Sequence, residues 1–234
     1  MPSAPFDAGH VLRGLTLFRE APEPTLMRLA ASARRVHLVR GDELFHSGEV
    51  SEGLYVVTRG QIKVYARADN GQEKVIEVVM APACLGESML GGEAIHSVNA
   101  TMLTDGVLLL LPREAVMREL RGGPDLAIHL LADVSGRVNR LVHDIEALTL
   151  RSASERVVAY LLRDGVVDVP PVPGDAGPCT VLLPASKGTI ASLLSVTPEH
   201  FSRILHELTE LGLIVVEGRK IHIPSVAKLR QHEG

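Results

Sequence analysis

Three polar residues near the C-terminus, Glu199, Ser202 and Arg203, have the types and spacing needed to read nucleic-acid bases. Steps of three and four residues place side chains on one face of a helix. An Arg side chain matches the two acceptors of guanine in the major groove, and a Glu side chain can accept from cytosine N4. The three residues are therefore our candidates for direct base contacts.

The surrounding residues predict two short helices that would present this face. Thr197 is suited to cap the second helix, and Pro198 fits its first turn. A strand, a Gly218 turn and a second strand follow, which predicts a hairpin flanking the helices. Small and apolar residues form the predicted core of the helix pair: Ile190, Ala191, Leu194, Val196, Phe201, Ile204, Leu205 and Leu208. Additional DNA contacts are assigned to Lys187, Thr197 and His200.

A long helix is predicted over residues 124–150, beginning at Pro124. Its apolar residues recur in alternating steps of three and four, which is typical of a two-stranded coiled coil. An ordinary buried helix is the alternative, because the run only just reaches three heptads. The predicted dimer interface consists of Leu131, Val134, Val138, Leu141, Ile145 and Leu148.

Short β-type runs occupy residues 36–111, after two short helices predicted within residues 11–33. Turn residues separate the runs, which indicates an antiparallel sandwich or barrel. Asn70-Gly71 predicts a tight hairpin, because such a turn needs positive φ at both central residues. A loop is expected over residues 164–184, with a strand at 181–183. We expect the polar segment 226–234 to fray.

The composition indicates a folded chain of 234 residues with a net charge of −4. Lys and Arg balance Asp and Glu from Arg151 onward, so DNA contacts would have to be local rather than a bulk electrostatic effect. Two cysteines exclude a disulfide framework and a four-thiolate iron–sulfur cluster. The sequence predicts no secretory signal and no membrane span, so we expect a cytoplasmic protein.

Residues 41–49 (GDELFHSGE) and 54–64 (LYVVTRGQIKV) resemble the cyclic-nucleotide-binding β-roll of the CRP/FNR superfamily of bacterial transcription regulators. The resemblance implies an α+β fold. It also implies three partners, which are double-stranded DNA, a second copy of the chain and RNA polymerase. It also implies a β-roll sensor (1–121), a dimerisation helix (122–150) and a winged helix-turn-helix (151–234). Glu-x-x-Ser-Arg is similar to the FNR/DNR form of the motif, which implies TTGAT-like half-sites. Ser195 replaces the family's usual turn Gly, which predicts mild backbone strain.

The effector pocket implied by the resemblance departs from the cAMP-binding pattern. Gly86, Glu87 and Ser88 match the phosphate-binding opening, but His96-Ser97 stands where the family has Arg-Ser or Arg-Thr. A neutral imidazole cannot replace a guanidinium. Leu141 and Val142 occupy the positions that contact the base with hydroxyl groups in cAMP-binding relatives. These differences argue against cAMP as the effector.

Residues 71–78 (GQEKVIEV) and the recognition motif resemble the DNR-type branch, which responds to nitric oxide through haem. The resemblance implies a haem hypothesis, with His10, His37, His46 and His96 as candidate ligands. Pro2 resembles the N-terminal haem ligand of the CO-sensing branch. The cysteine cluster of FNR-type oxygen sensors has no counterpart here.

Two classes of function remain open. One is a homodimeric transcription regulator gated by an effector in the β-roll, with a cyclic-nucleotide-responsive regulator as a variant. The other is a ligand-binding module that acts on a protein partner. The sequence contains no nucleophile with a base partner, no P-loop and no spaced set of metal ligands, so we do not expect an enzyme.

Overall fold

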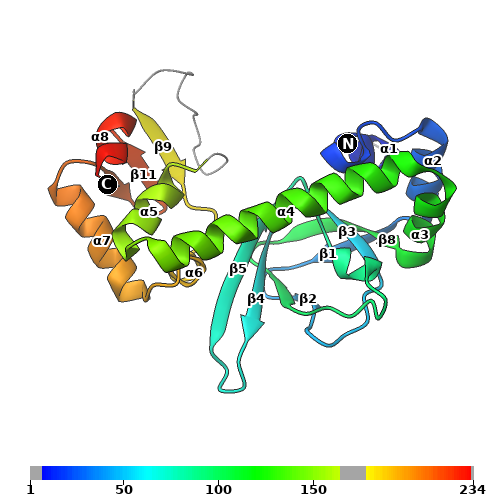
Figure 1. The fold of residues 1–234 in the computed structure, drawn as a ribbon, viewed down its shortest axis with the longest axis horizontal. Coiled ribbons are helices and arrows are strands. Elements are labelled where there is room, and N and C mark those ends of the chain that lie inside the picture. Colours follow the sequence, from blue (N-terminus) through cyan, green and yellow to red (C-terminus); the bar gives the residue numbers. More distant parts are fainter. Residues whose placement is uncertain (1–6, 164–177, 233–234) are drawn as a thin grey trace, which may run out of the picture. The chain divides into compact units, whose positions relative to one another are not determined.

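The computed structural model describes residues 7–163 and 178–232 (Figure 1). The chain divides into two compact units, residues 1–71 with 77–140, and residues 72–76 with 141–234. The boundary falls inside one continuous helix, α4 (Pro124–Leu150), which occupies the predicted range. Both helices and strands are present in each unit, so the predicted α+β class is confirmed.

Two four-stranded sheets form the β-roll of the first unit. In one sheet the order is β1-β8-β3-β6, and in the other it is β2-β7-β4-β5. The strand bounds are β1 Arg34–Leu38, β2 Glu43–Phe45, β3 Gly53–Arg59, β4 Gln61–Arg67, β5 Glu73–Met80, β6 Ala83–Leu85, β7 Asn99–Met102 and β8 Gly106–Pro112. The five β-type runs of the sequence, at residues 36–39, 54–57, 62–65, 75–80 and 107–111, coincide with β1, β3, β4, β5 and β8, except that Val39 lies just past the end of β1. The short strands β2, β6 and β7 were not predicted.

Strands β3 and β8 contribute to two hydrophobic cores. Leu54 and Val56 of β3 pack into a core shared with the helices, whereas Tyr55 and Val57 pack into the core of the β-roll. Residues of β8 divide in the same way. Because alternate side chains leave opposite faces of a strand, a strand covered on both faces is apolar throughout. This explains the uninterrupted apolar runs at residues 54–57 of β3 and 107–111 of β8.

The helices of the first unit cover one sheet of the roll. They are α1 (Ala8–Arg13), η1 (Thr16–Phe18), α2 (Glu23–Ser32), η2 (Glu87–Leu90) and α3 (Arg113–Gly122). Leu126 and Leu130, from the start of α4, are buried in the same core as α2 and α3. Arg28 of α2 donates two hydrogen bonds to Glu119 of α3, whose side chain is only 3% exposed. Both apolar and ionic contacts therefore hold the helices together.

The predicted tight hairpin at Asn70-Gly71 is wrong in its geometry. β4 ends at Arg67 and β5 begins at Glu73, so the connection is longer than two residues. Only Gly71 of the pair has positive φ, at 83°. The turn signal located the connection correctly but did not fix its length.

Besides the end of α4 and the start of β5, the second unit contains four helices and three strands among its described residues. The helices are α5 (Ala153–Leu161), α6 (Lys187–Leu193), α7 (Pro198–Glu210) and α8 (Val226–Gln231), and the strands are β9 (Cys179–Leu182), β10 (Val215–Glu217) and β11 (Lys220–Ile223). The sheet order is β10-β11-β9. Ser152 and Glu155 form a capping box at the start of α5, as N-cap chemistry predicts.

The expectation of a frayed C-terminus is wrong for residues 226–231. Val226 and Leu229 are buried, and Ser225 caps α8 by accepting from the Lys228 amide. A helix this short carries too little periodicity to be predicted from sequence. Most of the predicted 164–184 loop lies outside the described residues. No helix among the described residues combines the length and the apolar character needed to cross a bilayer.

Candidate nucleic-acid interface and effector pocket

Helices α6 and α7 form the predicted helix-turn-helix of the second unit. Their shared core contains the fully buried side chains of Ile190, Ala191 and Phe201. The Thr197 hydroxyl accepts from the His200 amide at 3.2 Å, and Pro198 occupies the first turn of α7. These contacts satisfy the start of α7 and fix its orientation on the core.

The turn between the helices has a left-handed residue, as predicted. Ser195 has φ +55°, a conformation that costs a residue with a Cβ more than it costs Gly. Arg156 of α5 supports this turn, since its Nε donates to the Leu194 carbonyl at 3.0 Å. Arg156 was not predicted from the sequence, because its partner lies 38 residues away in the chain.

Glu199, Ser202 and Arg203 are all exposed on α7. Arg203 lies 3.9 Å from Glu207, one turn further along, and its side chain is 67% exposed. The Ser202 hydroxyl donates to the Pro198 carbonyl at 2.9 Å, which leaves its oxygen lone pairs available as acceptors. The arrangement thus offers a guanidinium donor beside carboxylate and hydroxyl acceptors.

The other predicted DNA contacts lie near the beginnings of the two helices. Lys187 and His200 are partly exposed, whereas Thr197 is exposed and serves as the cap of α7. The predicted wing is present as β10 and β11, joined through Gly218 at φ +63°. Helix face and wing therefore belong to one compact unit.

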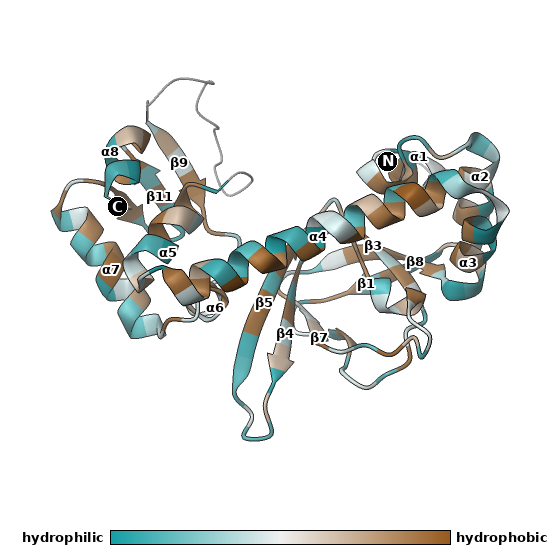
Figure 2. Ribbon diagram, viewed as in Figure 1, coloured by the Kyte–Doolittle hydropathy of each residue, from teal (hydrophilic) through white to brown (hydrophobic). Residues whose placement is uncertain are grey.

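An exposed apolar stripe runs along α4, where brown and teal residues alternate in Figure 2. Five of the six predicted interface residues belong to this stripe, whereas Val134 is only partly exposed. Ile128 and Val142 are also exposed. The stripe consists of Ile128, Leu131, Val138, Leu141, Val142, Ile145 and Leu148. Leu141 and Val142, which were assigned to the effector pocket, thus lie on this exposed surface.

The residues of the predicted phosphate-binding opening of the β-roll make contacts within the protein. Gly86 has φ +101°, and a Cβ there would approach the Gly53 carbonyl oxygen to 2.7 Å. The Ser88 hydroxyl lies 2.8 Å from His96 Nδ1, and the His96 ring stacks on Phe45 with centroids 3.7 Å apart. Burial lowers the pKa of His96, which favours the neutral imidazole.

Arg137 of α4 also contacts these residues and was not predicted from the sequence. Its Nη1 donates to Glu87 at 2.6 Å and its Nη2 to Glu77 at 2.5 Å. Burial raises the pKa of Glu87, and the Arg137 charge opposes that shift. Among the predicted pocket residues, Ser88 therefore contacts His96 and Glu87 contacts Arg137, while Ser97 is exposed.

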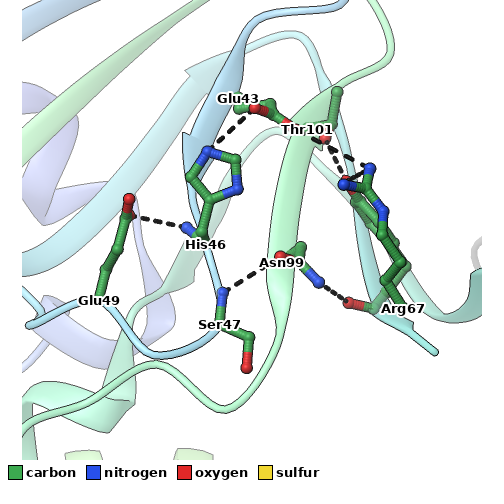
Figure 3. A network of polar contacts seen from close by, with 8 residues as sticks. Glu43, His46, Ser47, Glu49, Arg67, Asn99 and Thr101 are labelled. Atoms are coloured by element: carbon green, nitrogen blue, oxygen red, sulfur yellow. Dashed lines mark hydrogen bonds and ion pairs between the residues drawn. The ribbon is translucent and has the colours of Figure 1, made fainter. Parts of the chain in front are cut away.

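The four candidate haem ligands are either exposed or in contact with polar side chains. His10 and His37 are exposed, and His96 is held by Ser88. His46 belongs to the polar network of Figure 3, where its Nε2 lies 3.0 Å from Glu43. The described residues include no group of three or more His, Cys, Asp or Glu side chains placed to hold a metal ion. Pro2 lies outside the described residues.

The network in Figure 3 has a structural role. Asn99 accepts from the Ser47 amide at 3.1 Å and donates to the Tyr65 carbonyl at 3.3 Å, which fixes the loop after β2 to the sheet. The His46 amide donates to Glu49 at 2.8 Å in the same loop. His46 is accordingly held within a set of polar contacts and not in an apolar cavity.

Comparisons with known proteins match both units. The cyclic nucleotide-binding domain family matches residues 35–122, and the Crp-like helix-turn-helix domain family matches residues 155–232. The chain is 28% identical over 225 residues to the cyclic AMP receptor protein of Thermus thermophilus, covering 94% of this chain and 97% of that protein.

Solved structures show the same relationship. DNR from Pseudomonas aeruginosa is 32% identical with a TM-score of 0.51, and the match covers 97% of this chain and 99% of that chain. FixK2 from Bradyrhizobium japonicum has a TM-score of 0.74 at 23% identity, covering 85% of this chain and 96% of that one, which shows a shared fold.

Proposed function

Since the chain belongs to the CRP/FNR family of DNA-binding transcription regulators, we propose that it acts as a homodimer that reads a palindrome of TTGAT-like half-sites. The observation that carries this proposal is the exposed Glu199, Ser202 and Arg203 face on a capped helix with a buried core behind it. A recognition helix needs this combination, because its N-terminal residues must reach base edges from a rigid support. A DNA-reading role would place the protein in the cytoplasm.

Arg203 is assigned to a guanine and Glu199 to a cytosine. Both side chains are exposed, and Arg203 has guanidinium nitrogens beyond the Nε that faces Glu207. Direct readout of one base pair is worth about 1–3 kcal/mol, so Arg203→Ala should weaken binding to the palindrome by that amount and relax its preference at one position. Fluorescence anisotropy with the palindrome and single-base variants of it measures both effects.

Lys228→Ala is the matched control, because Lys228 is an exposed cation of α8 outside the assigned contacts. Its loss should leave base preference unchanged. Full retention of base preference in both Arg203→Ala and Glu199→Ala would contradict the assigned roles.

The apolar stripe of α4 supports the homodimer. Val138 and Ile145 are 52% and 61% exposed, and large exposed apolar surfaces on a folded chain mark contact sites. Two copies pairing through a stripe of this periodicity would form a two-stranded coiled coil, which gives the twofold symmetry that a palindrome requires. Val138→Arg should therefore yield a monomer in light scattering, with loss of palindrome binding. Asn139→Arg is the control, since Asn139 lies next to the stripe and is exposed.

The chemistry of the β-roll pocket disfavours a cyclic nucleotide as effector. His96 stands where cAMP-binding relatives supply a guanidinium, and Arg137 is already paired with two carboxylates. A phosphate would meet a neutral imidazole and an Arg whose charge is neutralised. Calorimetry with cAMP should accordingly detect no binding.

Haem and nitric oxide remain a hypothesis suggested by the likeness to DNR, but the residues here do not fit haem. Two of the four candidate histidines, His10 and His37, are exposed, and the other two have polar partners within 3.0 Å. We therefore assign no residue to haem. An absorbance spectrum of the purified protein mixed with haem tests this directly, because a ligated haem would produce a shifted Soret band.

A regulatory module that controls a protein partner is the alternative function. The exposed base-reading face favours DNA, and a gel shift with the palindrome separates the two functions. RNA polymerase is the protein partner that a DNA-bound regulator would contact.

A further inference from the structure

Helix α4 has two distinct faces within the first unit. Leu126, Leu130, Asp133 and Arg137 follow one another at steps of four, three and four residues, so they share one side of the helix. Leu126 and Leu130 are buried in the core of the helices, and Arg137 contacts the roll. Leu131 and Val138 lie on the exposed stripe instead.

Arg137 connects this helix to two separate elements of the roll. Glu87 belongs to η2, and Glu77 belongs to β5. The three side chains are largely shielded from solvent, with exposed fractions of 22% for Arg137, 18% for Glu87 and 34% for Glu77. Charge-assisted bonds of 2.5 and 2.6 Å in such an environment are strong, because water screens them poorly.

The charges around Arg137 also limit which ligand could bind there in place of the two Glu side chains. Glu77, Glu87 and Asp133 contribute negative charge near one guanidinium. An anionic ligand would have to separate Arg137 from carboxylates and would itself be repelled by them. Carboxylates of the protein itself thus occupy the place beside the Arg137 guanidinium that an anionic ligand would take.

We infer that the Glu77–Arg137–Glu87 bridge takes the place of a bound effector, so that α4 is held against the roll, with its apolar stripe outward, in the protein without any ligand. The inference rests on the proposed function and specifies its regulation: DNA binding is independent of a small-molecule effector. Control would then come from the amount of protein rather than from ligand binding. A gated regulator instead needs a ligand that binds one of two states more tightly.

The first test uses full-length wild-type protein refolded from denaturant, which removes any ligand that co-purifies. Its affinity for the TTGAT palindrome is measured alone and with saturating cAMP or cGMP. We expect the same dissociation constant in all three conditions, within about twofold, since a ligand without differential affinity shifts no equilibrium. Binding that appears only with a nucleotide would overturn the inference and leave the proposed function intact. No binding under any condition, with haem also supplied, would overturn the proposed function together with the inference.

The second test removes the bridge. Arg137→Met should weaken palindrome binding at least tenfold, whereas Arg140→Met, an exposed position three residues further along α4, should not. Circular dichroism and light scattering report whether each variant folds and dimerises. The double variant Glu77→Gln, Glu87→Gln should match Arg137→Met, because it removes the other half of the bridge. A folded Arg137→Met protein with wild-type affinity would overturn the inference, and if Arg137→Met fails to fold, the double variant decides in its place.

Discussion

Ser195→Gly should stabilise the helix-turn-helix. Ser195 is exposed and has φ +55°, and its carbonyl accepts from Arg156 in a contact that any residue can provide. A left-handed conformation costs a residue with a Cβ about 1–2 kcal/mol. Gly avoids this cost but loses more freedom on folding, by about 0.5–1 kcal/mol. The expected net gain is therefore about 0.5–1 kcal/mol.

Hydrogen exchange followed by mass spectrometry measures this gain locally. Peptides from α6 and α7 should exchange about two- to fivefold more slowly in Ser195→Gly, since 1.4 kcal/mol corresponds to a factor of ten. Ser202→Gly is the matched control, for which we expect faster hydrogen exchange. It places Gly in the interior of α7, where Gly is about 1 kcal/mol less favourable than Ala, and it removes the bond to the Pro198 carbonyl. Unchanged or faster exchange in Ser195→Gly would refute the strain argument.

Three further predictions concern the first unit. Leu130→Ala should destabilise the fold by about 2–5 kcal/mol in chemical denaturation, because Leu130 is buried, whereas Leu131→Ala at the adjacent exposed position should weaken only the dimer in light scattering. Gly86→Ala should cost about 2 kcal/mol or more, because the added Cβ combines positive φ with a clash against a backbone carbonyl; a wild-type melting temperature would contradict this. Glu119→Gln should destabilise the protein at neutral pH but not in acid. The hydrogen bonds from Arg28 lower the pKa of Glu119, so its contribution to stability is present above the unfolded-state pKa and disappears as pH falls through the folded-state pKa. A pH series of thermal melts should therefore show the melting temperatures of the variant and the wild type converging in acid.

The elements with strong local signals were predictable from the sequence. Helix α4 was located by its apolar spacing, and α7 was located by Thr197, Pro198 and the apolar residues after them. The left-handed turn at Ser195 was also anticipated. These features depend on neighbouring residues, so their signal is carried by a short window.

Contacts between distant residues were not predictable in this way. Arg137 lies 50 residues from Glu87 and 60 from Glu77, and nothing in the local sequence distinguishes it from the exposed Arg140. The contact between His96 and Ser88 also depends on the fold. The general location of the pocket was predicted from the resemblance to the CRP/FNR family, whereas its ion pairs could be identified only in the structure.

Strands β3 and β8, with apolar side chains on both faces, lack the pattern that normally fixes strand alignment. A one-residue slip would exchange one set of apolar residues for another, so hydrophobicity alone scarcely opposes it. Close backbone approach supplies the missing specificity, because a Cβ on Gly53 would lie 2.0 Å from the Leu111 carbonyl oxygen. Only a residue without a side chain can stand opposite this part of β8. The alignment of the central sheet therefore depends on the absence of a Cβ atom at Gly53. The placement of every residue around the pocket depends on the same feature.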